Sequence, residues 1–249
     1  MLSVDQAVIF AGGRGERLRP LTDHLPKPMA PVNGVPFLDY LIKTLEDAGI
    51  KKILFLLGYR AETIVNRYGH YLPSGVKVEY SIGTAEDLTG RRLLNAYLYL
   101  NDHFLLLYGD NYWPIEKKEI TALFESKKAS ALTTVFSNKR GTAEYGWENN
   151  VEVGEDAVVV EYDKKRVSKK LNGVDIGYFI IEKNVLDPKM PGNISFEETI
   201  LVSLAKERRL MAHVTNRQYY YITNIESLRN FEQVVKKEGF FPISLEANK

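Results

Sequence analysis

Short apolar runs alternate with amphipathic stretches along the first half of the chain. Apolar side chains at Phe37, Leu41, Leu45 and Ala48 recur at spacings of three and four residues, and they predict a helix that Gly49 ends. The near-continuous apolar runs are instead typical of strands that are covered on both faces. Strands in alternation with helices predict a parallel sheet with right-handed crossovers. The predicted strands lie at residues 7–11, 52–57, 76–81, 104–108 and 131–136, and the predicted helices at residues 37–48, 61–68, 93–100 and 117–128.

The pattern changes after about residue 140, where short strands are separated by turns and charge clusters. This texture predicts antiparallel structure beside the parallel sheet. We therefore expect an α/β fold: a Rossmann-like, mostly parallel sheet flanked by helices, with an antiparallel extension. Residues 1–249 should form a single domain, with a first part over 1–140 and a second part over 141–249 that includes a C-terminal helix. The predicted strands of the second half lie at 151–153, 158–162, 174–181, 210–214 and 219–222, and the predicted helices at 195–207 and 225–237.

Composition and charge exclude several classes of protein. Hydrophobic residues make up 45% of the 249 positions, which is ordinary for a globular protein and too high for a disordered one. The 33 basic and 32 acidic residues leave a net charge of +1, so no general basic field attracts nucleic acid or a membrane surface. The absence of cysteine excludes disulfides, thiolate zinc sites and a cysteine nucleophile. No run reaches the roughly 20 apolar residues of a membrane helix, and the start lacks a signal peptide, so we expect a cytoplasmic protein.

A glycine-rich segment at residues 11–22 follows the first predicted strand directly and reads AGGRGERLRPLT. Glycines at this place let backbone N–H groups converge on an anion without obstruction by Cβ atoms. Arg14, Arg17, Arg19 and Lys27 lie within fifteen residues and add the positive charge that a polyphosphate requires. Taken alone, the same segment also fits a strand-to-helix turn with solvated basic side chains.

Two common phosphate-binding motifs do not match this segment. The Rossmann dinucleotide fingerprint requires a third glycine at the place where Leu18 stands. The Walker A loop requires Gly-Lys followed by Ser or Thr, and the segment lacks it. A Rossmann oxidoreductase and a P-loop NTPase are therefore disfavoured.

The segment, with the Pro-Lys-Pro that follows it, resembles the signature of the sugar-1-phosphate nucleotidylyltransferases. These enzymes join a nucleoside triphosphate to a sugar 1-phosphate and release pyrophosphate. The resemblance implies that the backbone from Ala11 to Gly15 and the Arg17 side chain hold the triphosphate, and that Lys27 lies between the α-phosphate and the sugar phosphate. The matching residues are Gly12, Gly13, Gly15, Arg17, Leu18, Pro20, Leu21, Thr22, Pro26, Lys27 and Pro28. Arg14 is expected either to bind nucleotide or to be solvated.

Asp110 follows an apolar strand that ends in Gly109. Ligands of open α/β sheets bind beyond the carboxyl ends of strands, and a carboxylate there can hold Mg²⁺ together with phosphate oxygens. A Gly-Asp turn is the structural alternative. The resemblance implies that Asp110 binds the catalytic Mg²⁺. The family commonly supplies a second aspartate where Tyr221 stands here, so either Glu197 or Glu226 substitutes for it, Asp110 suffices, or catalysis is lost.

Residues 81–95 loosely resemble the segment of the family that reads the base. Glu86 or Asp87 could accept hydrogen bonds from a guanine or cytosine amine, and Thr89 and Gly90 are expected to contact the nucleotide. The structural alternative is a helix N-terminus with solvated arginines. Base identity is not evident from this stretch.

The sugar side of the site is expected in the second half of the chain. The resemblance implies that Lys164 binds the sugar phosphate and that the remaining substrate-binding residues line the sugar pocket, each with a structural or capping role as the alternative. Those remaining residues are Asn111, Tyr145, Gly146, Asp175 and Glu197.

The expected activity is that of an EC 2.7.7 enzyme whose partners are a nucleoside triphosphate and a sugar 1-phosphate. The attacking phosphate needs no general base, so catalysis should rest on positioning and charge neutralisation. Within the family, the sequence is most similar to the enzymes that activate D-glycero-D-manno-heptose with GTP. Mannose or glucose 1-phosphate with another nucleotide, and a weakly catalytic regulatory homologue, remain alternatives, and homo-oligomer formation is left open.

Overall fold

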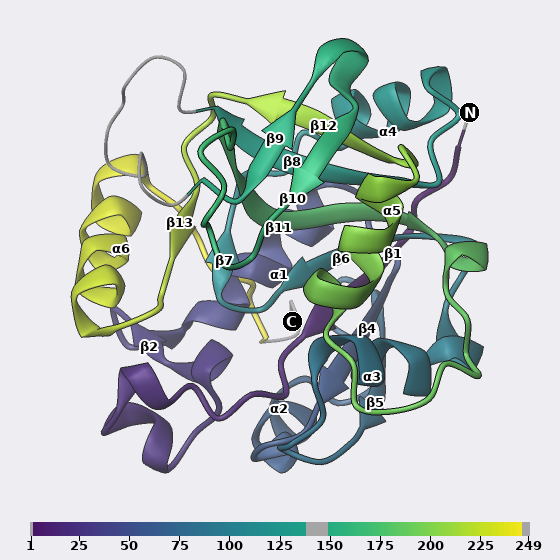
Figure 1. The fold of residues 1–249 in the computed structure, drawn as a ribbon. Coiled ribbons are helices and arrows are strands. Elements are labelled where there is room, and N and C mark those ends of the chain that lie inside the picture. Colours follow the sequence, from purple (N-terminus) through teal and green to yellow (C-terminus); the bar gives the residue numbers. More distant parts are fainter. Residues whose placement is uncertain (1, 138–148, 246–249) are drawn as a thin grey trace. The chain divides into compact units, whose positions relative to one another are not determined.

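The computed structural model describes residues 2–137 and 149–245, and its contacts divide the chain into two compact units. The glycine-loop unit comprises Asp5–Asp87, Leu107–Ile115 and Tyr219–Lys249. The mixed-sheet unit comprises Met1–Val4, Leu88–Leu106 and Glu116–Gln218. The chain passes from the second unit to the first within strand β6 (His103–Tyr108). The elements of both units are labelled in Figure 1.

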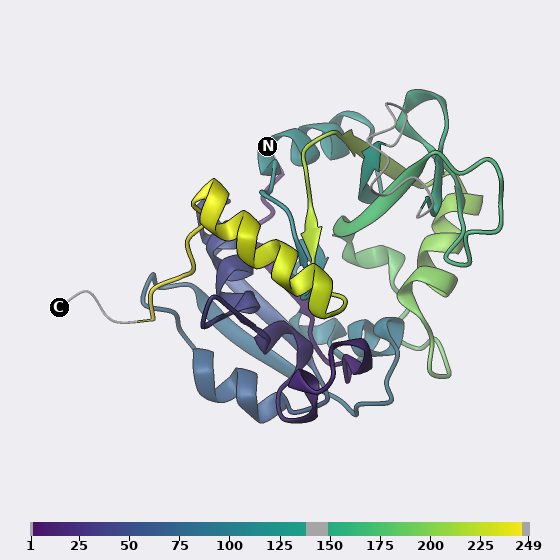
Figure 2. The ribbon, with the colours of Figure 1, turned by 90° about the vertical axis from the view of Figure 1, so that its left-hand side faces the viewer.

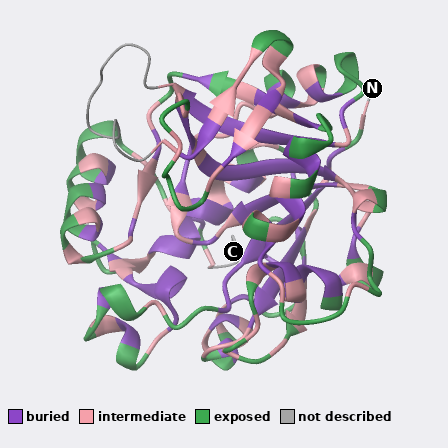
Figure 3. Cartoon of the chain, in the orientation of Figure 1, coloured by how far each residue is buried: buried purple, intermediate pink, exposed green. Residues whose placement is uncertain are grey.

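Three parallel strands form the sheet of the glycine-loop unit, in the order β1 (Gln6–Phe10), β4 (Lys52–Leu57) and β5 (Lys77–Ile82). All residues of β1 are buried, as are five of the six in β4, and Figure 3 shows the same burial along both strands. Helices α1 (Phe37–Asp47) and α2 (Ala61–Tyr68) lie in the connections between these strands. The apolar runs of the sequence thus form strands that are covered on both faces, as predicted.

The C-terminal helix α6 (Ile225–Glu238) packs within the glycine-loop unit (Figure 2). Asn224 and Ser227 form a reciprocal capping box at its start, and Gly239 ends it with a left-handed φ of 67°. The ring of Phe231 lies 5.1 Å from that of Phe37 and 5.0 Å from that of Tyr112. The last helix is therefore held by residues from early and middle parts of the chain.

Two short antiparallel strand pairs complete this unit. Strand β7 (Asn111–Tyr112) pairs antiparallel with β13 (Tyr220–Tyr221), and β2 (Pro31–Val32) pairs antiparallel with β3 (Val35–Pro36). The first of these pairs brings the segment after β6 beside the segment before α6.

The mixed-sheet unit is built around β8 (Ala131–Ser137), which pairs antiparallel with β11 (Gly173–Glu182) and parallel with β12 (Leu210–Thr215). Strand β9 (Val151–Val153) pairs antiparallel with β11 and with β10 (Val159–Tyr162). The helices of this unit are α3 (Thr89–Asn95), α4 (Lys117–Ser126) and α5 (Val202–Lys206), the last of which continues a π-helical turn over Phe196–Leu201.

These elements confirm the α/β class, with a mostly parallel sheet flanked by helices and added antiparallel strands. The predicted helix at 93–100 is displaced: it begins at Thr89 and ends at Asn95, and a separate 3-10 turn covers Tyr97–Tyr99. The division of one domain near residue 140 stays a prediction, although α6 belongs by its contacts to the glycine-loop unit. Within residues 2–137 and 149–245, no helix combines the length and the apolar character that crossing a membrane demands.

We expect Phe231→Ala to lower the free energy of unfolding by about 3–5 kcal/mol, because it leaves a cavity among buried aromatic and aliphatic side chains. Urea denaturation measures this change. Phe241→Ala is the matched control, since Phe241 is 74% exposed whereas Phe231 is 1% exposed, and it should change stability by less than about 0.5 kcal/mol. Equal losses in the two variants would contradict the packing of α6 described above.

Candidate functional site

The glycine-rich loop leaves the end of β1 and folds directly onto Lys27. Gly15 has a left-handed φ of 65°, and a Cβ atom at this position would lie 2.7 Å from the Cβ of Lys27. The carbonyl of Gly15 accepts hydrogen bonds from the Thr22 hydroxyl and the Leu18 N–H, both at 2.9 Å. Residue 15 therefore has to be glycine for both conformational and steric reasons. By contrast, a Cβ at Gly13 would meet nothing within 4 Å.

A hollow of about 370 Å³ opens beside this loop. Three cationic side chains line it, those of Arg14, Arg17 and Lys27. Glu16, the backbone of Gly15 and Thr223 complete the lining. A small, polar hollow with three cations suits a polyphosphate better than an apolar ligand.

Lys27 forms an ion pair with Asp110 inside the glycine-loop unit. Lys27 is buried in the 3-10 turn Lys27–Met29, and Asp110 follows the end of β6. The N–H of Gly109 donates to the carbonyl of Phe10 at 2.9 Å, and a Cβ at residue 109 would lie 2.9 Å from the same oxygen. This close approach brings the Lys27 turn and Asp110 together, as the sequence predicts for two residues of one site.

The donor set at Asp110 fits a magnesium ion that arrives with its substrate. No group of three or more His, Cys, Asp or Glu side chains in the described part of the chain could hold a metal by itself. Mg²⁺ needs only one or two carboxylates when phosphate oxygens and water complete its shell. Tyr221, which the resemblance aligns with a second aspartate of the family, pairs with Asn111 across β13 and β7. Glu226 is exposed in the first turn of α6.

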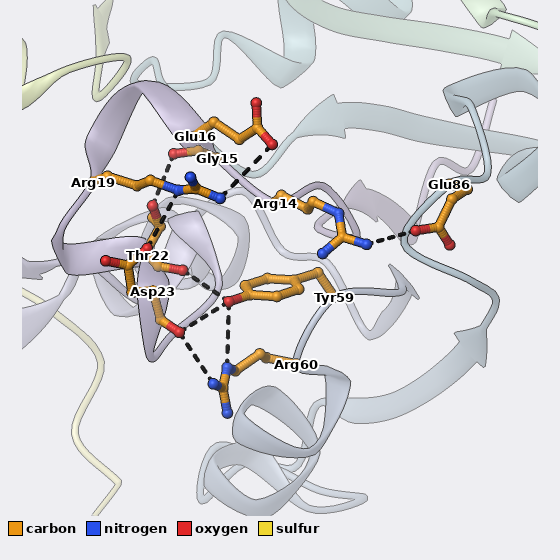
Figure 4. A network of polar contacts seen from close by, with 9 residues as sticks. All are labelled: Arg14, Gly15, Glu16, Arg19, Thr22, Asp23, Tyr59, Arg60 and Glu86. Atoms are coloured by element: carbon orange, nitrogen blue, oxygen red, sulfur yellow. Dashed lines mark hydrogen bonds and ion pairs between the residues drawn. The ribbon is translucent and has the colours of Figure 1, made fainter.

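Arg14 reaches from the glycine-rich loop to Glu86, with Nη2 and Oε1 2.6 Å apart (Figure 4). The guanidinium also lies 5.6 Å from the centre of the Tyr59 ring. The Tyr59 hydroxyl is within hydrogen-bond distance of the carbonyls of Thr22 and Asp23, at 3.0 and 3.1 Å. The hydrogen bond from Arg14 lowers the pKa of Glu86. Arg14 is thus an oriented side chain that remains half exposed, and its contact with a nucleotide stays a prediction.

The structure distinguishes the roles of Glu86 and Asp87, which the sequence left as equal candidates for reading the base. The carboxylate of Asp87 accepts hydrogen bonds from the N–H and the hydroxyl of Thr84, at 2.9 and 3.0 Å. The carboxylate of Asp87 therefore stabilises its own turn, whereas the carboxylate of Glu86 forms an ion pair with Arg14 of the glycine-rich loop.

In the mixed-sheet unit, two predicted site residues, Thr89 and Lys164, gather around a third, Glu197. One of its carboxylate oxygens accepts hydrogen bonds from the hydroxyls of Thr89 and Ser195, at 2.7 and 2.8 Å. The other oxygen lies 3.5 Å from the ammonium of Lys164. Thr89 also accepts a hydrogen bond from the N–H of Phe196 at 2.9 Å. Thr89 was expected at the nucleotide and the others at the sugar, but here they form one cluster, and their ligand contacts stay predictions.

Gly90 is required by close packing. A Cβ at this position would lie 2.9 Å from both the carbonyl oxygen and a side-chain carbon of Ile194. The neighbouring Arg91 donates to the carbonyls of Met190 and Gly192, at 2.5 and 2.7 Å, and so holds the same loop against α3. The alternative of a solvated arginine does not hold for Arg91, because its guanidinium donates hydrogen bonds to this loop.

Asp175 lies on β11 with its carboxylate surrounded by donors. It accepts hydrogen bonds from the Tyr162 hydroxyl at 2.7 Å, the Thr133 hydroxyl at 2.9 Å and the Gly177 N–H at 2.9 Å. Burial raises the pKa of Asp175 to about 6, and these donors oppose the rise. Burial likewise raises the pKa of Tyr162 well above its usual value. A structural role for Asp175 follows, and its contact with a sugar stays a prediction.

Two of the predicted substrate-binding residues, Tyr145 and Gly146, lie outside the described residues. Sequence reasoning missed Tyr59 and Thr223. Tyr59 follows β4, and the carboxyl end of a parallel strand is where a ligand-facing residue is expected, so its position was the available signal. Thr223 carries no comparable signal.

Comparisons with known proteins show which family the chain is similar to. The family model described as nucleotidyl transferase matches residues 6–226. The chain is 31% identical over 194 residues to the D-glycero-alpha-D-manno-heptose 1-phosphate guanylyltransferase of Campylobacter jejuni, covering 78% of this chain and 83% of that protein. It is 28% identical over 254 residues to the probable glucose-1-phosphate cytidylyltransferase of Bacillus subtilis, covering 93% and 95%. The structure of HddC from Yersinia pseudotuberculosis complexed with GMP-PN is similar with a TM-score of 0.74 at 25% identity, covering 93% and 99%.

The titration of Asp175 should be visible in the stability of the protein. Its ordinary pKa is 3.8, and the folded value is about 6, so the unfolded chain loses this proton first as pH rises. The free energy of unfolding of wild type should therefore fall relative to that of Asp175→Asn as pH rises from about 4 to 6. The fall should be on the order of 2 kcal/mol, and the difference between the two proteins should stay constant above that window.

Urea denaturation of both proteins from pH 4 to 7 measures this difference. Tyr162→Phe removes a donor that lowers the pKa of Asp175, so it should move the window to higher pH. A stability difference that does not vary with pH would show that Asp175 titrates normally.

Proposed function

The chain belongs to the nucleotidyl transferase family as a sugar-1-phosphate nucleotidylyltransferase, and on this premise we propose that it transfers the guanylyl group of GTP to the phosphate of a heptose 1-phosphate. The observation that carries the proposal is the ion pair of Lys27 with Asp110, since Lys27 also lines the hollow of the glycine-rich loop. A cation and a carboxylate at this place suit the two requirements of the reaction, anionic phosphates and a metal ion.

The triphosphate would occupy the hollow lined by Arg14, Arg17 and Lys27. The N–H of Ala11 already donates to the carbonyl of Leu56 at 3.0 Å, so the donors from this backbone would come from Gly12 to Gly15. No side chain at residues 12, 13 or 15 obstructs an approaching anion. In this proposal Arg17 and Lys27 are catalytic because they neutralise charge on phosphate oxygens during the transfer.

Guanine is the base that Glu86 suits best. A carboxylate accepts hydrogen bonds only, and the guanine edge offers a ring N–H beside an amine, which can engage both carboxylate oxygens. The guanylyltransferase of Campylobacter jejuni supports the same choice by similarity. The second candidate is transfer of a cytidylyl group to glucose 1-phosphate, favoured by the similarity to the Bacillus subtilis protein over nearly the whole chain.

On the sugar side, we place Lys164 at the sugar phosphate, with Glu197 as the residue that orients it through their ion pair. The hydroxyls of Thr89 and Ser195 occupy the other oxygen of Glu197 and so hold the carboxylate in place. Asn111, Gly90 and Asp175 remain proposed ligand-contacting residues on weaker grounds, because the structure engages Gly90 and Asp175 in packing and hydrogen bonds.

The reaction is an in-line displacement at the α-phosphorus. An oxygen of the sugar phosphate forms the new bond to phosphorus, and the bond to the bridging oxygen of the β-phosphate breaks, with its electron pair leaving on pyrophosphate. The attacking phosphate is already anionic, so no side chain has to remove a proton. Lys27 and Arg17 reduce the repulsion between the two anionic reactants. Asp110 would hold Mg²⁺, which supplies further positive charge to the phosphate oxygens when bound.

A panel assay tests the proposed reaction. The protein is mixed with Mg²⁺, each nucleoside triphosphate and the 1-phosphates of heptose, mannose and glucose, and pyrophosphate release is measured. We expect the highest kcat/KM with GTP and D-glycero-D-manno-heptose 1-phosphate. A preference for CTP with glucose 1-phosphate would favour the second candidate, and no release with any pair would favour a nucleotide-binding regulatory protein.

Lys27→Ala should lower kcat by about 100-fold or more, because it removes a buried cation from the reacting phosphates. Steady-state kinetics with the preferred substrate pair measure the loss. Lys43→Ala removes an equal charge from the exposed pair with Asp47 on α1 and should leave kcat within about two-fold of wild type. Normal turnover by a folded Lys27→Ala protein would exclude Lys27 from catalysis.

A further inference from the structure

One ion pair spans the region where the base and the triphosphate are proposed to bind. Arg14 lines the hollow of the glycine-rich loop, and its guanidinium is bonded to Glu86, the carboxylate best suited to the base. In the free protein, the guanidinium that would bind the triphosphate and the carboxylate that would bind the base are therefore bonded to each other. A ligand that uses both residues has to separate them.

We propose that the Arg14–Glu86 ion pair is a latch that the nucleotide replaces on binding, and that this exchange couples recognition of the base to recognition of the triphosphate. The latch rests on the proposed function, and it assigns Arg14 and Glu86 as a specificity-determining pair. When triphosphate oxygens take Arg14, Glu86 is released for the base. When the base takes Glu86, Arg14 is released for the triphosphate.

The strength of the pair suits an exchange. The side chains of Arg14 and Glu86 are 49% and 68% exposed, and ion pairs this exposed are weak. A guanidinium forms stronger, bidentate hydrogen bonds with phosphate oxygens than with a single carboxylate oxygen in water. Replacement by a ligand therefore costs little, and the pair still keeps the opposite charges together in the free protein.

Neighbouring groups support Arg14 or are engaged in contacts of their own. The Tyr59 ring lies beneath the guanidinium of Arg14, and the Tyr59 hydroxyl is anchored to backbone carbonyls (Figure 4), so Arg14 keeps one support after Glu86 leaves. Arg19 is paired within its own loop, 3.3 Å from Asp23. Asp87 is engaged with Thr84 in a local turn.

The latch predicts opposite effects on the two halves of the nucleotide. Arg14→Met releases Glu86, so guanosine should bind about two- to five-fold tighter while tripolyphosphate binds more weakly. Glu86→Gln releases Arg14, so tripolyphosphate should bind about two- to five-fold tighter while guanosine binds more weakly. In wild type, saturating tripolyphosphate should tighten guanosine by a similar factor, and guanosine should tighten tripolyphosphate equally.

Equilibrium dialysis with labelled guanosine and labelled tripolyphosphate, in Mg²⁺ buffer, measures these affinities. The double variant Arg14→Met with Glu86→Gln is the decisive control. If Glu86→Gln acts only through removal of a negative charge, it will tighten tripolyphosphate in the Arg14→Met background as well. The latch requires that this gain disappears there.

Arg19→Met and Glu62→Gln are the matched single controls, since each removes one charge from the glycine-loop unit outside the pair, and neither should produce the crosswise pattern. Binding of both probes without mutual tightening would overturn the latch and leave the proposed reaction standing. Failure of wild type to bind tripolyphosphate would overturn both.

Discussion

The close contact between the ends of β1 and β6 is the constraint on which the site depends. The Gly109 N–H reaches the carbonyl of Phe10, and this approach leaves no space for a side chain at residue 109. Gly15 makes a comparable approach to Lys27 one loop away. Two glycines thus let three backbone segments converge, and the convergence sets Lys27 beside Asp110. A Cβ at either glycine would push the cation and the carboxylate apart.

Charge within the site is balanced by internal pairs. Lys27 pairs with Asp110, Arg14 with Glu86, and Arg19 with Asp23. These local pairs explain how a chain with a net charge of only +1 can hold a concentrated cationic hollow without a general basic field. A polyphosphate with a metal ion can offer anionic oxygens to the cations and a cation to Asp110, whereas a simple anion leaves that carboxylate without a partner.

The hydrogen bonds of the described residues divide the candidate side chains into two groups. Asp87, Arg91 and Asp175 are committed to protein donors or acceptors that maintain a turn, a loop and a strand. Glu86 and Lys164 instead form ion pairs with other charged candidates, Arg14 and Glu197. The second group is therefore better placed to change partners when a ligand arrives.

The sequence by itself determined the order of helices and strands, the α/β class and the glycine-rich, basic character of the first loop. Those properties depend on apolar periodicity and on glycines next to one another, which are local. The tertiary structure alone decided that α6 packs beside α1 and that Glu86 rather than Asp87 forms the ion pair with Arg14. It also decided that the Thr89 hydroxyl donates a hydrogen bond to Glu197. Each of these joins residues far apart in the chain or chooses between adjacent carboxylates. Such outcomes follow from packing and hydrogen-bond geometry, which the local pattern of residues does not encode.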